Sequence, residues 1–294
     1  EYAAHLKTMG EDYQMLDAPD MKEVTGTTYY KSGLFTAGTA IIQPAAFVRS
    51  VSKGLKSNLV QIFENSPVTS LSRNGNWVAQ TPSGSVTAPK IILAVNGHLN
   101  SFGFLPNRLI HVFTYASMTR ALSSQESKLL GGRSVWGITP ADPMGTTVRR
   151  INSSEGHRIV VRNRFTYDPS MEVTENRIKR VARDHDRAFR ARFPMLSNIS
   201  MQYRWGGRLC LSRNNVSVVR QLEDGLYSAC CQNGLGTTRG TLSGLLAAEL
   251  ATETKSARLD RALSAPEPTK LLPQFLSKPG AATLLKWQEL QAGA

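Results

Sequence analysis

The feature that most restricts the fold of this chain is a glycine-rich turn late in the sequence, between a strand-like and a helix-like segment. Residues 226–231 are apolar or small, Gly234, Gly236 and Gly240 follow, and residues 241–250 are mostly apolar. A strand that turns sharply into a helix aims the free N–H groups of the first helical turn, and the positive end of the helix dipole, at whatever lies beside the turn. We therefore predict that the backbone of this turn lies close to a flat or anionic group.

The position of this turn argues against an ordinary dinucleotide-binding unit. Such a unit needs a second strand after the helix. Here residues 252–261 are polar, and a proline-rich tail follows them. We therefore expect the turn to close a site whose cofactor is bound mainly elsewhere.

Length and composition permit a large core. The chain has 294 residues, of which 41% are hydrophobic, enough for one complex domain or two smaller ones. No run of about eighteen apolar residues occurs, so we expect no membrane span. The first residue is Glu1 rather than Met, which indicates a processed or trimmed start, or a part of a larger protein.

The cysteines indicate a reducing compartment. Cys210, Cys230 and Cys231 form neither a disulfide framework nor a Cys-x-x-Cys pair. We expect buried, reduced thiols and a cytoplasmic location.

The net charge of +13 leaves a nucleic-acid-binding role to be considered. The positive charge is densest over residues 177–192, but no zinc finger, basic zipper or RNA-binding aromatic motif accompanies it. Solubility, arginines that hold structure or bind an anion, or a missing acidic partner segment explains the surplus more readily. We rank this role last and expect no nucleic-acid partner.

The order of elements predicts a mixed α/β (α+β) protein. Proline and glycine bound an amphipathic helix over residues 44–55, and the longest helix pattern covers residues 172–193. The expected strands cover residues 60–64, 68–73, 77–82, 90–95, 110–119, 134–138, 146–151, 157–162, 201–205, 216–219 and 226–231. Asn74-Gly75 marks a hairpin turn, and the near-alternating segments between residues 107 and 165 predict a mostly antiparallel sheet. A terminal helix is expected over residues 281–291.

Several short motifs recur here in a specific order. They are the helix starting at Pro44, the segment Val60–Val68, Trp77-Val-x-x-Thr81, the run Ile91-Ile-Leu-Ala-Val-Asn-Gly97, Tyr203-Arg-Trp-Gly-Gly207, Asp224-Gly-Leu-Tyr227 and Asn233-Gly-Leu-Gly236. In this order the chain resembles the D-amino-acid oxidase-like (DAO) family of FAD-dependent oxidoreductases, which includes glycine oxidase, sarcosine oxidase and γ-glutamylputrescine oxidoreductase. Each motif alone is weak, and the specificity lies in their order and spacing up to about residue 252.

The resemblance implies an FAD-binding Rossmann-like domain interleaved with an antiparallel substrate domain. It implies a partial FAD-binding domain over residues 1–100, a substrate-binding domain over 101–200, a return to the FAD-binding domain over 201–265, and a tail with a helix over 266–294. The family also begins with a strand and a Gly-x-Gly-x-x-Gly turn that holds the FAD pyrophosphate, and nothing before Ile41 supplies one. We therefore expect a companion chain or an N-terminal fragment to complete the FAD site.

The resemblance also assigns cofactor contacts. Backbone N–H groups of residues 234–238 would stabilise negative charge at the pyrimidine edge of the flavin, Val68 would contact the adenine, and the strand end at Gly97 would pass close to FAD. The implied cofactor contacts are Val68, Ala94, Asn96, Gly97, Asn233, Gly234, Leu235, Gly236, Thr237 and Thr238. From the residues alone, an ordinary turn or plain strand packing explains each segment too.

The substrate contacts are less sharply defined. Trp205 and Arg208 lie where family members approach flavin and substrate, and Arg208 could bind a carboxylate through two hydrogen bonds. Tyr115 would lie on the strand above the pocket, although a tyrosine in the core is commoner. Arg162, Arg164 and Tyr167 are weaker candidates. No histidine pairing indicates a metal site, and no residue is assigned as catalytic.

Two hypotheses follow. In the first, the chain is the C-terminal portion of an FAD-dependent oxidoreductase that oxidises the CH–NH bond of an amino acid or other amine by hydride transfer to flavin N5. The reduced flavin would then pass its electrons to oxygen or to an electron-transfer partner, and the sequence leaves both alternatives open. In the second, it is a non-catalytic or structural subunit with a degenerate flavoprotein fold.

Overall fold

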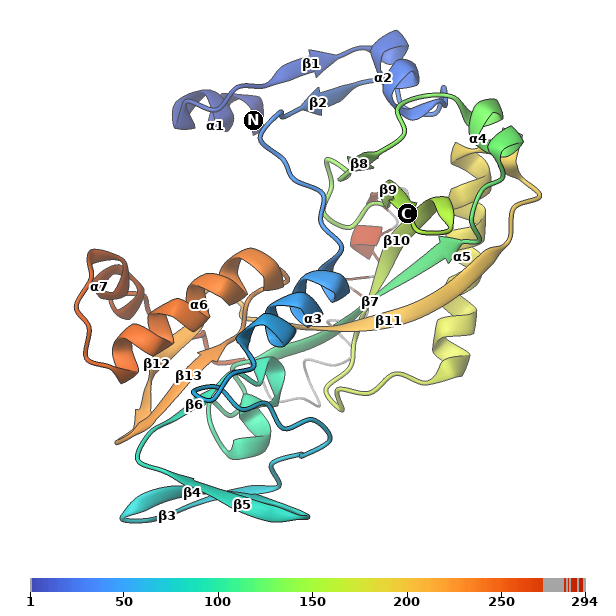
Figure 1. The fold of residues 1–294 in the computed structure, drawn as a ribbon. Helices are drawn as coiled ribbons and strands as arrows, with labels where there is room; N and C mark the ends of the chain where they lie inside the picture. Colours follow the sequence, from blue (N-terminus) through green and yellow to red (C-terminus); the bar gives the residue numbers. More distant parts are fainter. Residues whose placement is uncertain (1, 272–282, 284, 286, 290, 293–294) are drawn as a thin grey trace.

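The largest sheet consists of long antiparallel strands from the middle of the chain (Figure 1). In this computed structural model, which describes residues 2–271, 283, 285, 287–289 and 291–292, five strands lie in the order β11–β7–β10–β9–β8 and form what we call the large sheet. They are β7 (Ile110–Thr119), β8 (Trp136–Ile138), β9 (Thr147–Ser153), β10 (Gly156–Tyr167) and β11 (Met201–Leu211). The antiparallel pairing predicted from the sequence is confirmed.

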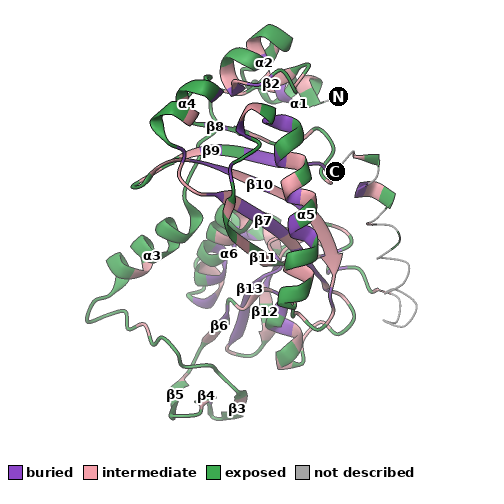
Figure 2. Ribbon diagram, turned by 90° about the vertical axis from the view of Figure 1, so that its right-hand side faces the viewer, coloured by how far each residue is buried: buried purple, intermediate pink, exposed green. Residues whose placement is uncertain are grey.

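Helix α5 (Glu175–Arg192) covers one face of the large sheet. It begins at Thr174, whose hydroxyl accepts the backbone N–H of Arg177. Its apolar stripe packs on alternate residues of the strands, and these residues form the main core: Val148, Ile159, Val161, Phe189 and Phe193. Figure 2 shows α5 on one side of the sheet and helices α3 and α6 on the other.

A second sheet, which we call the mixed sheet, contains β12 (Val218–Glu223), β13 (Leu226–Cys230) and β6 (Ile91–Leu93) in that order. Strands β12 and β13 form an antiparallel hairpin, whereas β6 runs parallel to β13. Every residue of β13 is buried, as expected for a strand with a neighbour on each side and helix α6 (Gly236–Ala251) against it. Helix α7 (Ala257–Leu263) packs next to α6.

A third sheet, the hairpin sheet, contains β3 (Ser70–Asn74), β4 (Asn76–Thr81) and β5 (Gly84–Ala88). The turn predicted at Asn74-Gly75 is confirmed, with Gly75 at a φ of 71°. The buried Trp77 attaches this sheet to the mixed sheet, since its indole Nε1–H donates to the carbonyl of Asp224 at 2.9 Å.

The first elements of the chain lie beside the end of the large sheet (Figure 1). They are α1 (Tyr2–Met9), β1 (Gln14–Leu16), α2 (Ala18–Thr25) and β2 (Gly33–Phe35). Asp17 caps α2, and the backbone N–H of Arg133, beyond α4 (Ser124–Leu130), donates to the carbonyl of Val24 at 2.9 Å. Short 3-10 turns, η1 (Asn96–Phe102) and η2 (Pro194–Leu196), complete the set of elements.

Helix α3 (Pro44–Leu55) has the bounds that the sequence predicts, but none of its residues is buried. The strand expected over residues 60–64 is wrong, because these residues form no strand. A strand is stabilised by hydrogen bonds to a neighbouring strand, and here this segment finds none among the described residues. Val60 and Phe63 remain exposed, Phe63 at 66%.

The fold class predicted from the sequence is confirmed: helices combine with parallel and antiparallel strands. The expected terminal helix falls partly outside the described residues, and those that are described, such as residues 287–289, are helical. Among the described residues, no helix is long and apolar enough to cross a lipid bilayer.

Candidate functional site

The two parallel strands of the mixed sheet end at the same edge. Ile91 pairs with Leu226, and Leu93 with Ser228, so the loops that follow β6 and β13 leave the sheet side by side. The Asn96 side-chain oxygen accepts the backbone N–H of Cys231 at 3.2 Å and joins the two loops. Ligands of open α/β sheets bind outside the carboxyl ends of the strands, which makes this edge the candidate site.

The turn between β13 and α6 uses left-handed backbone. Asn233 and Gly234 have φ angles of 52° and 78°. The Asn233 side chain holds the turn: its oxygen accepts the N–H of Ser212 at 2.8 Å, and its amide donates to the carbonyl of Val216 at 3.0 Å. The backbone N–H of Asn233 donates to the backbone carbonyl of Cys210 at 3.2 Å. The end of β11 therefore fixes the turn in place.

The first turn of α6 is open to a ligand. No side chain caps its N-terminus at Leu235, and residues 234–238 are exposed. A Cβ atom added at Gly234 or Gly236 would meet nothing within 4 Å. Free N–H groups and a positive dipole end beside open space fit the electron-rich edge of a flavin ring. The observed geometry is therefore compatible with the FAD contacts expected for Asn233, Gly234, Leu235, Gly236, Thr237 and Thr238.

The loop after β6 passes close to the large sheet. Asn96 has a φ of 48°, and the buried Gly97 lies against β7 and β11. A Cβ atom at Gly97 would stand 2.9 Å from His111 Nδ1 and 3.4 Å from Cys210 Cβ. Glycine is thus needed here so that the loop after β6 can approach β7 and β11 closely. This contact joins the mixed sheet to the large sheet. Ala94, at the start of the loop, is exposed.

Two of the three expected substrate contacts lie on β11, near this loop. Arg208 Nη1 lies 3.1 Å from Nε2 of His98, the residue after Gly97. Trp205 is 41% exposed. The structure therefore brings Arg208 to the carboxyl edge of the mixed sheet, whereas Trp205 aligns with Ala116 on β7 and faces the other side of the large sheet.

Tyr115 and Val68 are placed differently. Tyr115 is 1% exposed and packs with Phe113 and Val181, between the large sheet and α5. Its hydroxyl lies 2.6 Å from Thr166 Oγ1, so the structure gives it the core environment that is commoner for tyrosine. Val68 is 40% exposed in the segment that enters β3.

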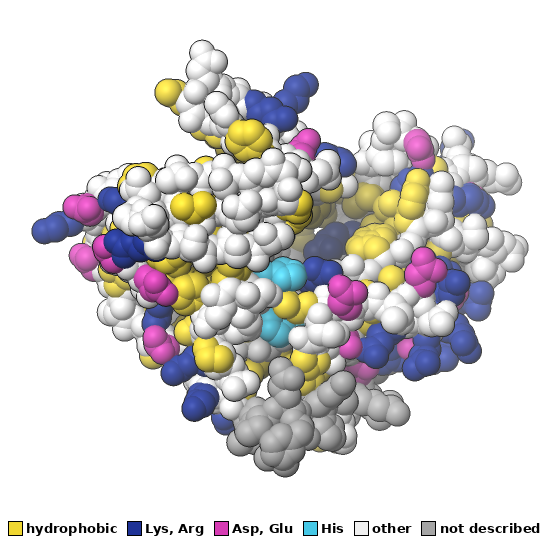
Figure 3. All heavy atoms as spheres, turned by 90° about the horizontal axis from the view of Figure 1, so that it is seen from below, with side chains coloured by type: hydrophobic (Ala, Val, Ile, Leu, Met, Phe, Trp, Pro, Cys, Tyr) yellow, Lys and Arg dark blue, Asp and Glu magenta, His cyan; other side chains and the backbone are white. Residues whose placement is uncertain are grey.

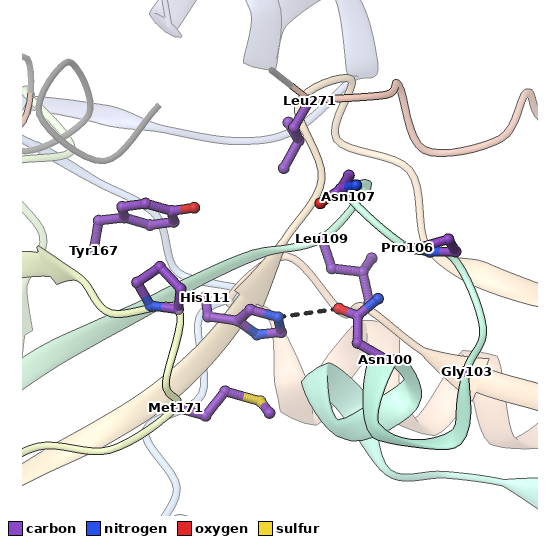
Figure 4. A pocket seen from close by; sticks show the side chains of 10 residues that line it. Asn100, Gly103, Pro106, Asn107, Leu109, His111, Tyr167, Met171 and Leu271 are labelled. Carbon is purple, nitrogen blue, oxygen red and sulfur yellow. Dashed lines mark hydrogen bonds between the residues drawn. The ribbon is translucent and has the colours of Figure 1, made fainter. Parts of the chain in front are cut away.

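A cavity of about 260 Å³ lies behind the Gly97 loop. It is lined by Asn100, Gly103, Pro106, Asn107, Leu109, His111, Tyr167, Pro169, Met171 and Leu271. Figure 4 shows the imidazole of His111 turned toward the amide of Asn100, at 3.1 Å between Nε2 and Oδ1. The volume is below the range of about 300–1,000 Å³ typical of small-molecule sites.

The hydrogen bonds of Asn100 fix the tautomer of His111. The amide nitrogen of Asn100 donates to the carbonyls of Phe104 and Leu105, at 2.9 and 2.8 Å, so its oxygen accepts the Nε2–H of His111. Burial, with a smaller effect of His98, lowers the pKa of His111. The Nε2–H of His111 therefore points to Asn100, and its Nδ1 faces Gly97.

The surface near this region is hollowed. Figure 3 shows a depression with Lys or Arg side chains inside it and with histidine and hydrophobic side chains at its rim.

Among the described residues, no group of three or more His, Cys, Asp or Glu side chains could hold a metal ion.

Sequence reasoning did not single out His98 and His111. The signal for His98 was its place directly after Asn96-Gly97, where a chain leaves the end of a buried strand. For His111 the sequence offers no local signal, because its contact with Gly97 depends on how β7 packs against the loop after β6.

Known proteins of one family are similar to this chain. The family model described as "DAO: FAD dependent oxidoreductase" matches residues 1–250. The chain is 22% identical over 269 residues to a "Probable oxidoreductase OrdL" of Rhizobium meliloti (strain 1021), covering 88% of this chain and 59% of that protein. It is 24% identical over 247 residues to the γ-glutamylputrescine oxidoreductase of Escherichia coli (strain K12), covering 81% of this chain and 54% of that protein. The chain thus spans little more than half the length of these curated relatives.

Solved structures show the same fold. Glycine oxidase from Geobacillus kaustophilus superposes with a TM-score of 0.72 at 15% identity, covering 92% of this chain and 70% of that one. An L-proline dehydrogenase from P. horikoshii superposes with a TM-score of 0.63 at 15% identity, covering 87% of this chain and 69% of that one. Since the family model covers most of the chain, the chain belongs to the DAO family of FAD dependent oxidoreductases.

Proposed function

We propose that this chain forms the flavin-ring edge and the substrate-facing sheet of an enzyme that oxidises the CH–NH bond of an amino acid or other amine. The observation that carries the proposal is the open, uncapped start of α6 beside the loop that follows β6. The names of two similar proteins, γ-glutamylputrescine oxidoreductase and glycine oxidase, support amines and amino acids as the substrate class.

The residues at the edge have distinct tasks in this proposal. The backbone N–H groups of residues 234–238 and the dipole of α6 would stabilise negative charge on a flavin ring bound beside them. Asn233 holds that turn, and Gly97 lets the neighbouring loop approach. FAD, when bound, would supply the two-electron chemistry, as the acceptor at N5 of a hydride from the carbon that bears the nitrogen. The oxidised substrate would be an imine, which takes up water to give a carbonyl compound and an amine.

We further propose that polypeptide outside these 294 residues, a companion chain or an N-terminal fragment, completes the FAD site. The sequence contains no Gly-x-Gly-x-x-Gly turn to hold a pyrophosphate. Strand β6 is an edge of the mixed sheet, and its Ile92 is 39% exposed. Buried parallel strands are normally covered on both faces and flanked by further strands.

Exposed apolar side chains of α3 support the same proposal. Phe47, Val48, Val51 and Leu55 share one helix face and are 43%, 63%, 45% and 52% exposed. We infer that this face, which we call the α3 apolar face, packs against the missing part of the FAD-binding domain.

We also propose a domain division and a location for the chain. The domains are residues 1–100, 101–200, 201–265 and 266–294, as the family resemblance implies. The proposed location is cytoplasmic, because the three cysteines are buried and form no disulfide.

The missing pyrophosphate turn also supports a second candidate, a non-catalytic subunit with a degenerate flavoprotein fold. One experiment separates the two. The protein is purified with everything that accompanies it, its chains are weighed by denaturing mass spectrometry, and its absorption spectrum is recorded before and after anaerobic addition of candidate amines. A flavin band that bleaches with an amine supports the enzyme. A colourless, intact assembly that takes up no added FAD supports the structural subunit.

A further inference from the structure

The outer face of α5 carries a row of positive charge. The side chains of residues 181, 182, 185 and 189 are buried against the large sheet, and successive residues of a helix are turned by about 100°. The opposite, outward face holds five exposed cations, which we call the basic ridge: Lys179, Arg180, Arg183, Arg187 and Arg190. The ridge extends along about 17 Å of helix.

The aspartates of α5 bind arginines of the large sheet. Arg164 Nε lies 2.9 Å from an oxygen of Asp184, and Arg204 Nη2 lies 2.8 Å from an oxygen of Asp186. Asp184 is also 3.4 Å from Arg187, whose side chain is 77% exposed, and an exposed pair of this kind contributes little. The carboxylates nearest the ridge are therefore already paired on the inner side of the helix.

The other cations of the ridge have weak partners or none. Within the described part of the chain, no Asp or Glu forms an ion pair with Arg180, Arg183 or Arg190, and Lys179 Nζ lies 4.0 Å from the exposed Glu175. Like charges three and four residues apart on one helix repel each other. A row of uncompensated positive charge therefore favours a partner that carries many negative charges.

The ridge is not smooth. Arg183, Asp186, Arg187, Arg190 and Ala191 line a depression that is open to solvent. The three guanidinium groups therefore stand around a space that an anionic group can enter, and guanidinium groups match phosphate oxygens in geometry.

An exposed tryptophan is anchored beside α5. Trp287 is 55% exposed. Two residues later, the buried Glu289 lies 3.2 Å from Arg164 Nη1 and accepts the backbone N–H of Phe165 at 2.7 Å. Because Arg164 also contacts Asp184 of α5, this anchor holds the indole on the same side of the molecule as the ridge. Tryptophan beside arginine is typical of surfaces that bind at lipid head groups.

The basic ridge faces away from the candidate FAD site. Figure 2 shows α5 on one side of the large sheet, and α3 and α6 on the other. The missing polypeptide and the flavin are proposed to lie at the α3 apolar face and at the first turn of α6. The ridge should therefore stay exposed in the complete assembly.

We propose that the basic ridge docks the protein on the surface of an anionic lipid bilayer, with Trp287 at the depth of the head groups. The phosphates of anionic lipids present negative charge over an extended surface, and a helix that lies along that surface brings its whole ridge to them. This docking needs no membrane-spanning helix. It is also independent of the proposed function, because it uses no residue of the candidate FAD site.

Co-sedimentation of the purified assembly with lipid vesicles tests the proposal. One set of vesicles contains equal parts of phosphatidylcholine and phosphatidylglycerol, and the other contains phosphatidylcholine alone. The ridge variant combines Arg180→Gln, Arg183→Gln and Arg190→Gln. We expect wild type to bind only the anionic vesicles, and the ridge variant to bind them about a hundred-fold more weakly, since each arginine contributes about five-fold.

A matched control separates the ridge from net charge. Arg213→Gln, Lys255→Gln and Arg261→Gln together remove the same charge from exposed positions after β11 and in and before α7, which Figure 1 shows far from α5. This control should bind like wild type, and an equal loss in both triple variants would overturn the proposal. Replacing the three ridge arginines by lysine keeps the charge and should keep binding, which guards against misfolding. Trp287→Ala should cause a smaller loss.

Other results would refute the proposal directly. Wild type that does not bind the anionic vesicles would do so, as would binding that added salt leaves unchanged, because salt screens exposed charges. A DNA duplex or polyglutamate that binds through the ridge arginines, while the vesicles do not bind, would assign the ridge to another polyanion. The flavin spectrum of the ridge variant should equal that of wild type, whatever amine the assembly oxidises.

Discussion

His185 shows how one buried side chain joins α5 to the large sheet. It is 1% exposed, its Nδ1 lies 2.7 Å from Ser117 Oγ on β7, and its Nε2 lies 3.4 Å from the carbonyl of Asn163 on β10. Burial lowers the pKa of His185 from 6.5 to about 4. The folded protein therefore holds this imidazole neutral in a range where the unfolded chain binds a proton.

The pH dependence of stability follows from this difference. Between about pH 6.5 and pH 4 the unfolded state binds more protons at this residue, so the free energy of unfolding falls as pH falls, by up to about 1.4 kcal/mol per pH unit. We expect His185→Gln to flatten this slope, measured by urea unfolding across that range. The exposed His5→Gln should keep the wild-type slope, and an unchanged slope in His185→Gln would contradict the prediction.

Gly97 is a second residue whose size matters. The methyl group of Gly97→Ala would stand 2.9 Å from His111 Nδ1, closer than van der Waals contact allows. We expect a loss of about 1–3 kcal/mol in the free energy of unfolding, as for other overpacked sites, measured by chemical denaturation. Gly244→Ala is the matched control. The added methyl meets nothing within 4 Å in α6, so a gain of about 0.5–1 kcal/mol is expected.

At the scale of elements, α5 depends on its first turn. The hydroxyl of Thr174 accepts the backbone N–H of Arg177 at 3.3 Å, and no other side chain of the described residues caps this end. We expect Thr174→Ala to reduce stability by about 1 kcal/mol, measured by thermal or urea unfolding. Thr174→Ser retains the hydroxyl and should remain close to wild type. A loss of similar size in both variants would show that the methyl group, and not the cap, is responsible.

The success of sequence-based prediction also differs by element. The amphipathic period and the bounding proline predicted α3 correctly, because both signals are local. The prediction of a strand over residues 60–64 was wrong, because a strand needs a neighbouring strand, which no local pattern reveals. The alignment of Arg162 with Trp205 could not be predicted either, because register depends on turns and on a bulge between Asn163 and Phe165.

At the scale of the whole molecule, the α3 apolar face is the surface on which assembly should depend. A charge at its centre, Val51→Asp, places a carboxylate in the proposed interface, which costs several kcal/mol when unpaired. We expect this variant to lose the co-purifying chain and the flavin absorption, measured by mass spectrometry and spectroscopy. Val86→Asp changes a similarly exposed valine on the hairpin sheet and should keep both. Retention of both by Val51→Asp would place the interface elsewhere.

The candidate site itself was predictable in part. The glycine pattern located the turn at residues 234–238, and the apolar run that ends at Gly97 located the neighbouring loop. Their meeting at one edge depends on the parallel pairing of β6 with β13, which are separated by more than a hundred residues. Neither that pairing nor the approach of His111 to Gly97 has a local signature.

Trp205 on β11, Ala116 on β7 and Arg162 on β10 are aligned across the large sheet. Neighbouring strands lie about 4.8 Å apart, and Ala116 on β7 stands between these two residues. The backbone positions of Trp205 and Arg162 therefore lie about 10 Å apart. Hydrogen bonds between the strands hold this spacing, so it changes only if the pairing of the large sheet changes.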